Sequence, residues 1–256
     1  MIWPAEAIWE AVEPRLPGFT VEVLPEVDST NSELMRRVRA GDTAPVLLVA
    51  EHQTAGRGRL GRTWDSANRS DLTFSLGMPL APHDWSGLSL AVGLSVAESL
   101  HPALKLKWPN DVWLDGRKLA GILIETASMG GQRFAVIGIG VNMTVRNEEG
   151  LRTPPAALDE ILPGMDAPRA LATIVPDLVR QIQRFEVQGF APLRPAFALR
   201  DHLLGREVLC SDTTAGVAHG VDSTGALLVH TAAGVKKITS AEVSVRPTPP
   251  RAENTH

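Results

Sequence analysis

The glycine–arginine segment at residues 56–64 carries side chains that could do chemistry on an anion. Its arginines, at positions 57, 59 and 62, are permanently charged and present forked donors suited to phosphate and carboxylate groups. Its glycines, at positions 56, 58 and 61, allow the backbone to bend closely around a ligand. The segment has no apolar periodicity with which to build a core, so the sequence predicts an anion-binding loop.

The same glycines match the GxGxxG spacing of dinucleotide-binding folds. That motif requires a helix directly after the glycines, with its N-terminus against the pyrophosphate. Residues 62–70 form a poor helix and no βαβ pattern follows, so the sequence disfavours a dinucleotide site. For this segment taken alone, an ordinary solvated surface loop remains the alternative.

A second dense segment lies at residues 107–121. Asn110 and Asp111 fall between two expected strands, where polar side chains can face a cleft, although an ordinary Asx turn has the same pattern. Lys118 follows an Asp115-Gly116 pair, which is typical of a hairpin turn. A lone lysine at a strand edge usually extends along the surface, but this one accompanies other polar and charged residues.

Gly121, inside the next expected strand, indicates close approach by a ligand or another backbone. Several fixed cations and a flexible loop suit the attack of one anion on another. A carboxylate that attacks the α-phosphate of ATP meets like-charge repulsion, which arginines and a lysine would offset through positioning and electrostatics. The product would be an acyl-adenylate, although spacing alone leaves other phosphate chemistry open.

The elements that position these residues follow from periodicity and turn signals. Short apolar or alternating runs predict strands at residues 21–25, 46–50, 72–76, 105–108, 112–114, 119–125 and 134–141. Helices are expected from Ser29 or Thr30 to about Ala40, at residues 88–100 and at residues 170–186. Five further short runs, at 206–210, 216–221, 226–230, 235–239 and 243–246, predict a small β module.

The sequence thus predicts an α+β fold with a mixed, largely antiparallel sheet and packed helices, followed by a barrel-like β module. We expect a catalytic domain at residues 1–204, a small β domain at 205–247 and a disordered tail at 248–256.

Composition disfavours several classes of protein. The 256 residues are 44% hydrophobic and 21% charged, which is ordinary for a globular chain, and the net charge of −4 argues against broad nucleic-acid binding. Cys210 is the single cysteine, so no intrachain disulfide forms, and we expect it to be buried. Without a signal peptide or a long apolar run, the sequence predicts a cytoplasmic protein with no membrane span.

Together, these motifs resemble the biotin protein ligase family. The matching segments occur in the family's order over most of residues 28–142, and the β module matches its C-terminal domain. The segments are Asp28-Ser29-Thr30-Asn31 and residues 50–59, 107–111, 117–125 and 138–142. Their joint spacing is highly specific, whereas each segment alone is a weak signal.

The resemblance implies a class II synthetase-like catalytic domain with a C-terminal SH3-like barrel. It implies a two-step reaction, in which biotin and ATP with Mg²⁺ give biotinyl-5′-AMP and pyrophosphate. The biotinyl group then passes to one lysine of a biotin carboxyl carrier protein, typically of acetyl-CoA carboxylase. The sequence leaves the metal ligands unknown.

The resemblance also implies the site residues. Lys118, Arg57 and Asp111 are expected to be catalytic. Ser29, Thr30 and Asn31 match the biotin-binding turn, and Lys118 matches a lysine that contacts the biotin carboxylate and the phosphate. The full set expected to bind the ligands is Ser29, Thr30, Asn31, Gln53, Gly56, Arg57, Gly58, Arg59, Trp64, Asn110, Lys118, Gly121 and Asn142. Among them, Asn142 is expected near the adenylate or the metal.

Two departures from the family pattern matter. Leu60 stands where many relatives carry another arginine. The stretch before Asp28 is too short for the helix-turn-helix domain of repressor-type members, so a monofunctional ligase that does not bind DNA is expected. A lipoate–protein ligase-like acyl-adenylate transferase and a non-enzymatic biotin sensor are the alternatives, and a homodimer stays open.

Overall fold

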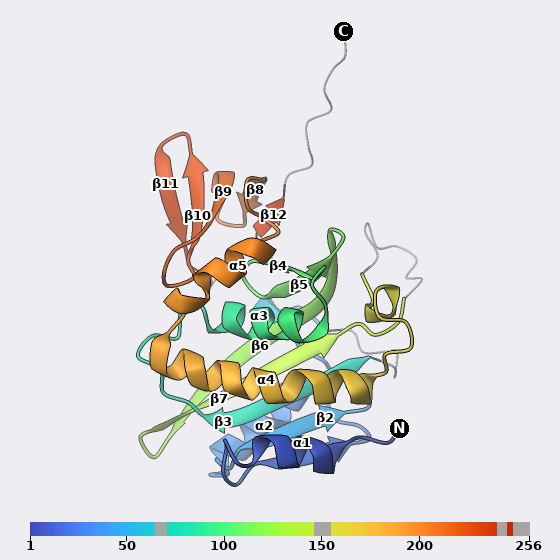
Figure 1. Ribbon diagram of the computed structural model, residues 1–256. Helices are drawn as coiled ribbons and strands as arrows, with labels where there is room; N and C mark the ends of the chain where they lie inside the picture. The colour runs from blue at the N-terminus through green and yellow to red at the C-terminus, as the bar shows by residue number, and fades with distance from the viewer. Residues whose placement is uncertain (65–70, 146–154, 240–244, 248–256) are drawn as a thin grey trace.

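The structure, a computed structural model, describes residues 1–64, 71–145, 155–239 and 245–247. Figure 1 shows a large sheet with helices packed on it and a smaller sheet near the C-terminal end of the described chain. The predicted α+β class is confirmed.

The large sheet has seven strands in the order β1-β2-β3-β7-β6-β5-β4. β1 and β2 are parallel, and the other neighbouring strands are antiparallel, as the sequence predicts for most of the sheet. The strands are β1 (Thr20–Leu24), β2 (Val46–Ala50), β3 (Leu72–Pro79), β4 (Lys105–Lys107), β5 (Asp111–Leu114), β6 (Arg117–Met129) and β7 (Gln132–Val141).

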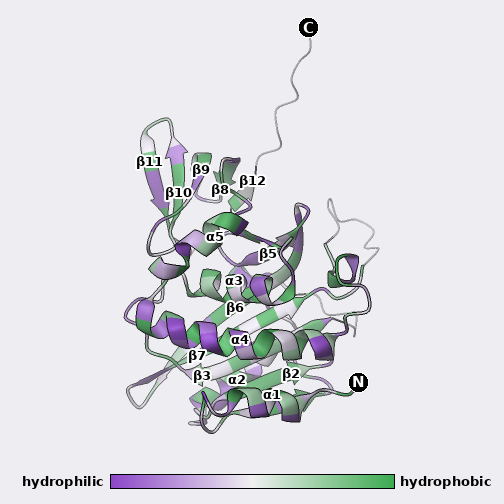
Figure 2. Cartoon of the chain, in the orientation of Figure 1, coloured by the Kyte–Doolittle hydropathy of each residue, from purple (hydrophilic) through white to green (hydrophobic). Residues whose placement is uncertain are grey.

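Different helices cover the two faces of this sheet (Figure 1). α1 (Ala5–Val12), α3 (Leu88–Leu100) and α4 (Ala167–Gln188) bury their apolar side chains with alternate strand residues in one large cluster. α2 (Thr30–Arg39) covers part of the opposite face, in a smaller cluster that includes Leu48. Figure 2 shows hydrophobic residues along the central strands and hydrophilic residues interspersed along α4, whose other side meets solvent.

Local sequence explains where α2 begins. Ser29 is the N-cap, and its side chain accepts a hydrogen bond from the Ser32 amide at 3.4 Å. Glu33 and Arg37 form an ion pair one turn apart, 2.9 Å between Oε1 and Nε. The predicted start of this helix is therefore confirmed.

The Asp115-Gly116 turn also forms as predicted. It joins β5 to β6, and both residues have positive φ, 47° and 76°. By contrast, the sequence does not predict α1, because its eight residues are fewer than a periodicity window of about 11 residues needs.

The smaller sheet is antiparallel, with the order β11-β10-β9-β8-β12. Its strands are β8 (Glu207–Cys210), β9 (Ala215–Val221), β10 (Leu227–Thr231), β11 (Gly234–Ile238) and β12 (Val245–Pro247). The connections of the two sheets meet, since Trp108 Nε1, between β4 and β5, donates to the carbonyl oxygen of Gly225, between β9 and β10, at 3.0 Å. Cys210 is buried in the smaller sheet, as expected. The division between residues 204 and 205 stays a proposal, and the predicted tail at 248–256 lies outside the described residues.

The remaining described elements are short. They are the 3-10 turns Arg59–Gly61 (η1), Leu158–Glu160 (η2) and Ala191–Leu193 (η3), and the helix Arg194–Arg200 (α5). Within the described ranges, no helix combines the length and the apolar content needed to cross a membrane.

Candidate active site

A row of small and polar residues crosses the open face of the large sheet. The strand register sets Ala50, Thr73, Gly140, Gly121 and Asp111 side by side on five successive strands. Because side chains alternate along a strand, apolar neighbours of this row such as Leu72, Ala120 and Val141 face the apolar cluster on the other side. Because most of the side chains in this row are small, there is space above the sheet for a ligand.

A cavity of about 140 Å³ lies on this face, bordered by the start of α2 and by the glycine–arginine loop. Most of the predicted site residues line it: Ser29, Thr30, Asn31, Gln53, Arg57, Gly58, Arg59, Trp64, Asn110, Asp111, Lys118 and Gly121. Gly56 and Asn142 are the predicted residues that do not line it. The fold therefore brings three segments that are distant in the chain, 29–31, 53–64 and 110–121, to one place.

The turn at the start of α2 forms one wall of the cavity. Thr30 and Asn31 are only 4% and 3% exposed. The Thr30 amide donates to Gln53 Oε1 at 2.8 Å, and Asn31 Nδ2 donates to Glu125 Oε2 at 3.0 Å. The Ser75 hydroxyl lies 2.6 Å from Asn31 Oδ1 and 2.7 Å from Thr30 Oγ1. These hydrogen bonds orient the polar groups of the wall before any ligand binds.

Two glycines of β7 allow other side chains to reach the sheet. A Cβ on Gly138 would lie 2.2 Å from Asn31 Oδ1, and one on Gly140 would lie 2.3 Å from the Trp64 ring. Both distances are far shorter than a van der Waals contact, so a larger residue would displace Asn31 or Trp64. Gly121, paired with Gly140, also faces the Trp64 ring.

Gly121, Gly138 and Gly140 together form a flat part of the sheet surface, the glycine floor. Lys118 lies at its edge. Its Nζ forms an ion pair with Asp111 Oδ1 at 2.8 Å and lies 5.5 Å from the centre of the Trp64 ring. The lysine side chain is 40% exposed and the aspartate 15% exposed. The carboxylate thus positions an ammonium group that a ligand can reach, which favours a role in the site over a lysine lying along the surface.

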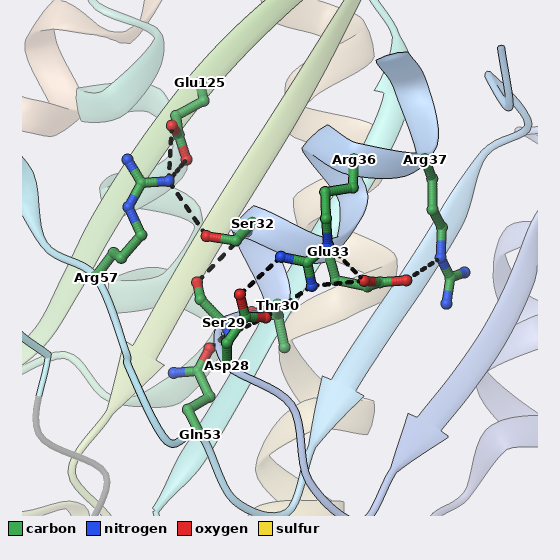
Figure 3. A network of polar contacts seen from close by, with 10 residues as sticks. All are labelled: Asp28, Ser29, Thr30, Ser32, Glu33, Arg36, Arg37, Gln53, Arg57 and Glu125. Carbon is green, nitrogen blue, oxygen red and sulfur yellow. Dashed lines mark hydrogen bonds and ion pairs between the residues drawn. The ribbon is translucent and has the colours of Figure 1, made fainter. Parts of the chain in front are cut away.

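The arginines of the loop contact different partners. Arg57 Nη1 lies 3.1 Å from Glu125 Oε1 and 3.4 Å from Ser32 Oγ (Figure 3). Arg59 Nη1 donates to Asn110 Oδ1 at 3.2 Å. Burial lowers the pKa of Arg59 from its usual range, but a guanidinium remains charged at neutral pH. Arg57 therefore ties the loop to α2 and β6, and Arg59 carries a partly desolvated charge.

Gly56 and Asn142 support the cavity from outside its lining. Gly56 lies against the backbone of Trp64, where a Cβ would be 2.4 Å from the carbonyl oxygen. Asn142 is 6% exposed, and its Nδ2 donates to the carbonyl oxygens of Lys118 and Ala156, each at 3.2 Å. Each of them positions a segment whose other residues face the cavity.

A charged network stabilises the turn from the solvent side (Figure 3). Arg36 donates to both carboxylate oxygens of Asp28, at 2.7 and 2.8 Å, and the Ser29 amide donates to Asp28 at 2.8 Å. The hydrogen bond from Arg36 is the largest cause that lowers the pKa of Asp28 from 3.8 to about 2. Asp28 therefore stays ionised at neutral pH and keeps the start of α2 in place.

Several residues of the site are not predicted from the sequence. They are Thr73, Ser75, Glu125, Gly138 and Gly140. The alternation of Gly138 and Gly140 in an apolar strand is a signal of close approach that could have revealed both. Glu125 carries no such signal, because its role depends on which side chains lie beside it in the fold.

A second cavity, of about 540 Å³, adjoins the first. Arg59, Pro109 and Ile122 line both cavities. The second is further bordered by residues 87–90 at the start of α3, by Ile124 and residues 126–128 of β6, and by Gly225 in the turn between β9 and β10. The two cavities therefore share part of their walls.

Comparison with known proteins identifies relatives of both parts of the chain. A family model described as the biotin/lipoate A/B protein ligase family matches residues 23–142. A model of the biotin protein ligase C-terminal domain matches residues 203–246.

Individual relatives are similar over most of the chain. The bifunctional ligase/repressor BirA of Escherichia coli is 35% identical over 91% of this chain and 76% of its own length. The biotin–[acetyl-CoA-carboxylase] ligase of Paracoccus denitrificans is 32% identical over 86% of this chain and 98% of its own. The structure of the Aquifex aeolicus biotin protein ligase in complex with biotin and ATP matches with a TM-score of 0.75 and 30% identity, over 89% of this chain and 99% of that one.

Proposed function

We infer that the chain is a biotin protein ligase, because it belongs to the biotin/lipoate A/B protein ligase family and carries the biotin protein ligase C-terminal domain. A carboxylate oxygen of biotin attacks the α-phosphorus of ATP, pyrophosphate leaves, and biotinyl-5′-AMP forms. The amine of an acceptor lysine then attacks the acyl carbon, loses a proton and displaces AMP. The acceptor is a biotin carboxyl carrier protein, in line with relatives named for acetyl-CoA carboxylase.

The ion pair of Lys118 and Asp111 on the glycine floor is the observation that carries the mechanism. Two anions must meet in the first step, and charge builds on the phosphoryl oxygens as they react. A positioned ammonium stabilises that charge without reorganising during the reaction. Lys118 is therefore our principal catalytic residue, and Arg59 adds a second positive charge from the loop.

The distribution of charge in the cavity supports one orientation for biotin. The wall formed by Ser29, Thr30 and Asn31 is buried and uncharged, and suits the neutral ureido group of biotin. The cations Lys118 and Arg59 suit its carboxylate and the phosphates. We therefore place the ureido end at the turn and the reacting carboxylate at Lys118.

Asp111 and Asn110 complete the nucleotide side. Asn110 Nδ2 donates to the Ile122 carbonyl oxygen at 2.8 Å, which leaves its Oδ1 to hold Arg59. Asp111 holds Lys118 and is our candidate for orienting the acceptor amine in the second step.

The donor set fits Mg²⁺ that arrives bound to ATP. Among the described residues, no three His, Cys, Asp or Glu side chains converge on one point. Asp111 is the one acidic side chain in the described lining of the first cavity. Mg²⁺ usually keeps several waters and is held by one or two carboxylates together with substrate phosphates, so this site fits it.

The second cavity offers a route for the acceptor lysine. Biotin and ATP take up the first cavity, and the two cavities meet at Arg59, Pro109 and Ile122. Thr126 and Ser128 are exposed residues on the wall of the second cavity. We therefore propose that the carrier domain approaches across the β6 side of the molecule.

A direct assay tests the proposed function. The purified chain is incubated with ATP, Mg²⁺ and a biotin carboxyl carrier domain, with either biotin or lipoate as the acid. We expect pyrophosphate release and a rise in acceptor mass by one biotinyl group with biotin, and loss of both on removal of Mg²⁺ with a chelator.

The lipoate arm distinguishes the alternative that the family description also includes. Labelling with lipoate and not with biotin would show a lipoate ligase, and biotin binding without pyrophosphate release would show a sensor. The predictions that the protein is cytoplasmic and does not act on DNA stay predictions, and a homodimer stays open.

A further inference from the structure

Glu125 on β6 joins two parts of the site that are far apart in the sequence. Its Oε2 accepts a hydrogen bond from Asn31 Nδ2 at 3.0 Å, on the buried turn of α2. The same carboxylate lies 3.1 Å from Arg57 Nη1, on the glycine–arginine loop (Figure 3). Glu125 is 23% exposed, so solvent screens this ion pair less than it screens a fully exposed one.

The contacts of Asn31 extend this link to the deepest part of the turn. The Ser75 hydroxyl bridges Asn31 Oδ1 and Thr30 Oγ1, and the amide of Thr30 donates to Gln53. Gln53 itself follows β2 and precedes the glycine–arginine loop in the sequence. A closed set of contacts therefore runs from one end of the loop, through the turn, to Glu125 and back to Arg57.

The strand register explains why Glu125 can make both contacts. Gly121, Leu123 and Glu125 alternate onto the open face of β6, and Leu123 pairs with Gly138 on β7. Because Gly138 has no side chain, Asn31 reaches down to the sheet beside Leu123 and donates to its carbonyl oxygen at 3.2 Å. Glu125 then lies one pleat further along, between Asn31 and the loop.

We propose that Glu125 is a positioning residue that fixes the glycine–arginine loop to the biotin-binding turn, so that the order of the loop depends on the order of the turn. The proposal deepens the proposed function and rests on it for the identity of the ligand. Glu125 acts through Arg57 and Asn31 and has no contact of its own with the reacting atoms.

Two substitutions separate the contacts of Glu125. Glu125→Gln keeps an oxygen that accepts from Asn31 but removes the charge that holds Arg57. Glu125→Ala removes both contacts. Asp212→Asn is the matched control, because Asp212 also forms a 3.1 Å ion pair, with Lys236, in the smaller sheet remote from the loop.

Hydrogen exchange of the full chain without ligand measures the link. The loop amides of Gly58, Arg62 and Trp64 are hydrogen-bonded within the loop and report its order. Glu125→Gln should speed their exchange about 2- to 5-fold, the range for a partly exposed ion pair, and leave the Thr30 amide unchanged. Glu125→Ala should speed exchange at both places, and Asp212→Asn at neither.

Steady-state kinetics provides a second measurement. Glu125→Gln should raise the KM for biotin by a similar factor with kcat nearly unchanged, because Lys118 is untouched. Glu125→Asp, which keeps the charge, should restore part of that loss. A double variant with Arg57→Gln should be no worse than Arg57→Gln alone, because the two side chains form one contact.

Each of the following results would overturn a different part of the proposal. Loop exchange in Glu125→Gln equal to that of wild type overturns the tether between Glu125 and Arg57. Faster loop exchange in Glu125→Ala with an unchanged Thr30 amide overturns the coupling to the turn. Because exchange is measured without ligand, a wild-type chain that fails to release pyrophosphate with biotin refutes the proposed function and leaves the tether standing.

Discussion

Ile137 and Gly138 are neighbours on β7, yet they belong to opposite faces of the large sheet. Ile137 is fully buried in the apolar cluster that includes α1, α3 and α4. Gly138 lies under the Asn31 amide, which occupies the place where its Cβ would be. The same strand therefore places a large apolar side chain in the core and, on its other face, leaves space for Asn31 in the site.

The comparison of the two faces shows how one sheet can serve two purposes. On the core face, stability comes from apolar area removed from water, and side chains of similar volume can replace one another. On the open face, Asn31 and Trp64 approach the backbone so closely that residue size matters more than hydrophobicity. Substitutions on the two faces should therefore affect different measurements.

The largest effect should follow from removing the cation on the open face. Lys118→Ala should lower the rate of biotinyl-5′-AMP formation by about 100- to 1000-fold, the range for loss of one preorganised electrostatic contact. The melting temperature should change little, because Lys118 is 40% exposed. Lys237→Ala is the control, since Lys237 forms a similar 2.9 Å ion pair with Asp222 away from the cavity. Wild-type rates of pyrophosphate release in Lys118→Ala would refute the assignment.

The next effect should come from a single methyl group on the open face. Gly138→Ala sets a Cβ about where Asn31 Oδ1 lies, so the turn must move. We expect biotin affinity, measured by calorimetry, to fall by roughly 10-fold or more, equivalent to about 1–3 kcal/mol for overpacking.

Gly93→Ala is the same substitution on the core side, in α3. Its Cβ would meet the ends of the Ile122 and Leu106 side chains at 3.3 Å, and these can shift. Biotin affinity should stay at the wild-type value in this variant. If Gly93→Ala weakens biotin binding as much as Gly138→Ala does, the distinction between the faces does not hold.

A smaller effect is expected for Ile137→Val on the core face, and it should change stability rather than ligand binding. Deleting one buried methyl group should lower the free energy of unfolding by about 1 kcal/mol. The kcat and the KM for biotin should remain at wild-type values, because the backbone of β7 keeps its register. Denaturant titration together with steady-state kinetics checks both parts. A clear change in the KM for biotin in Ile137→Val would contradict this prediction. It would show that packing in the core also affects the open face.

The smallest effect concerns pH and the turn on the open face. The pKa of Asp28 is lowered in the folded chain to about 2, so its interaction with Arg36 contributes fully above about pH 4 and is lost as the pH falls toward 2. Asp28→Asn should therefore be less stable than wild type at pH 6 by about 0.5 kcal/mol, a small value because the ion pair is largely exposed. The difference should vanish near pH 2 in parallel thermal unfolding curves, and a constant difference across this range would contradict the assignment.

The chemistry of the site follows largely from residue types. The arginines and glycines of residues 56–64, together with Lys118, predict an anion-handling site, and most of the predicted side chains line one cavity. The helices and strands of the large sheet are also largely predictable, because periodicity and caps are local. Ser29 as the N-cap and Asp115-Gly116 as the turn are two examples.

The partners within the site are not predictable in this way. Glu125 belongs to the matching segment 117–125, but nothing local assigns it a role until the register brings it beside Asn31 and Arg57. Gly56 and Asn142 belong to the matching motifs, but the fold sets them behind the cavity rather than in its lining. Val245, from the smaller sheet, also lines the cavity, although in the sequence it is far from the other lining residues.

By itself, the sequence determined which groups are present and which segments are helix, strand or turn, because propensity, periodicity and capping act over a few neighbouring residues. The tertiary structure decided which face of the sheet each residue serves and which charge meets which partner. The physical reason is strand register, because pairing across β3, β7 and β6 is set by packing between segments distant in the chain. A shift of one residue would bring Ile137 or Ile139 to the open face in place of the glycines that the ligand site requires.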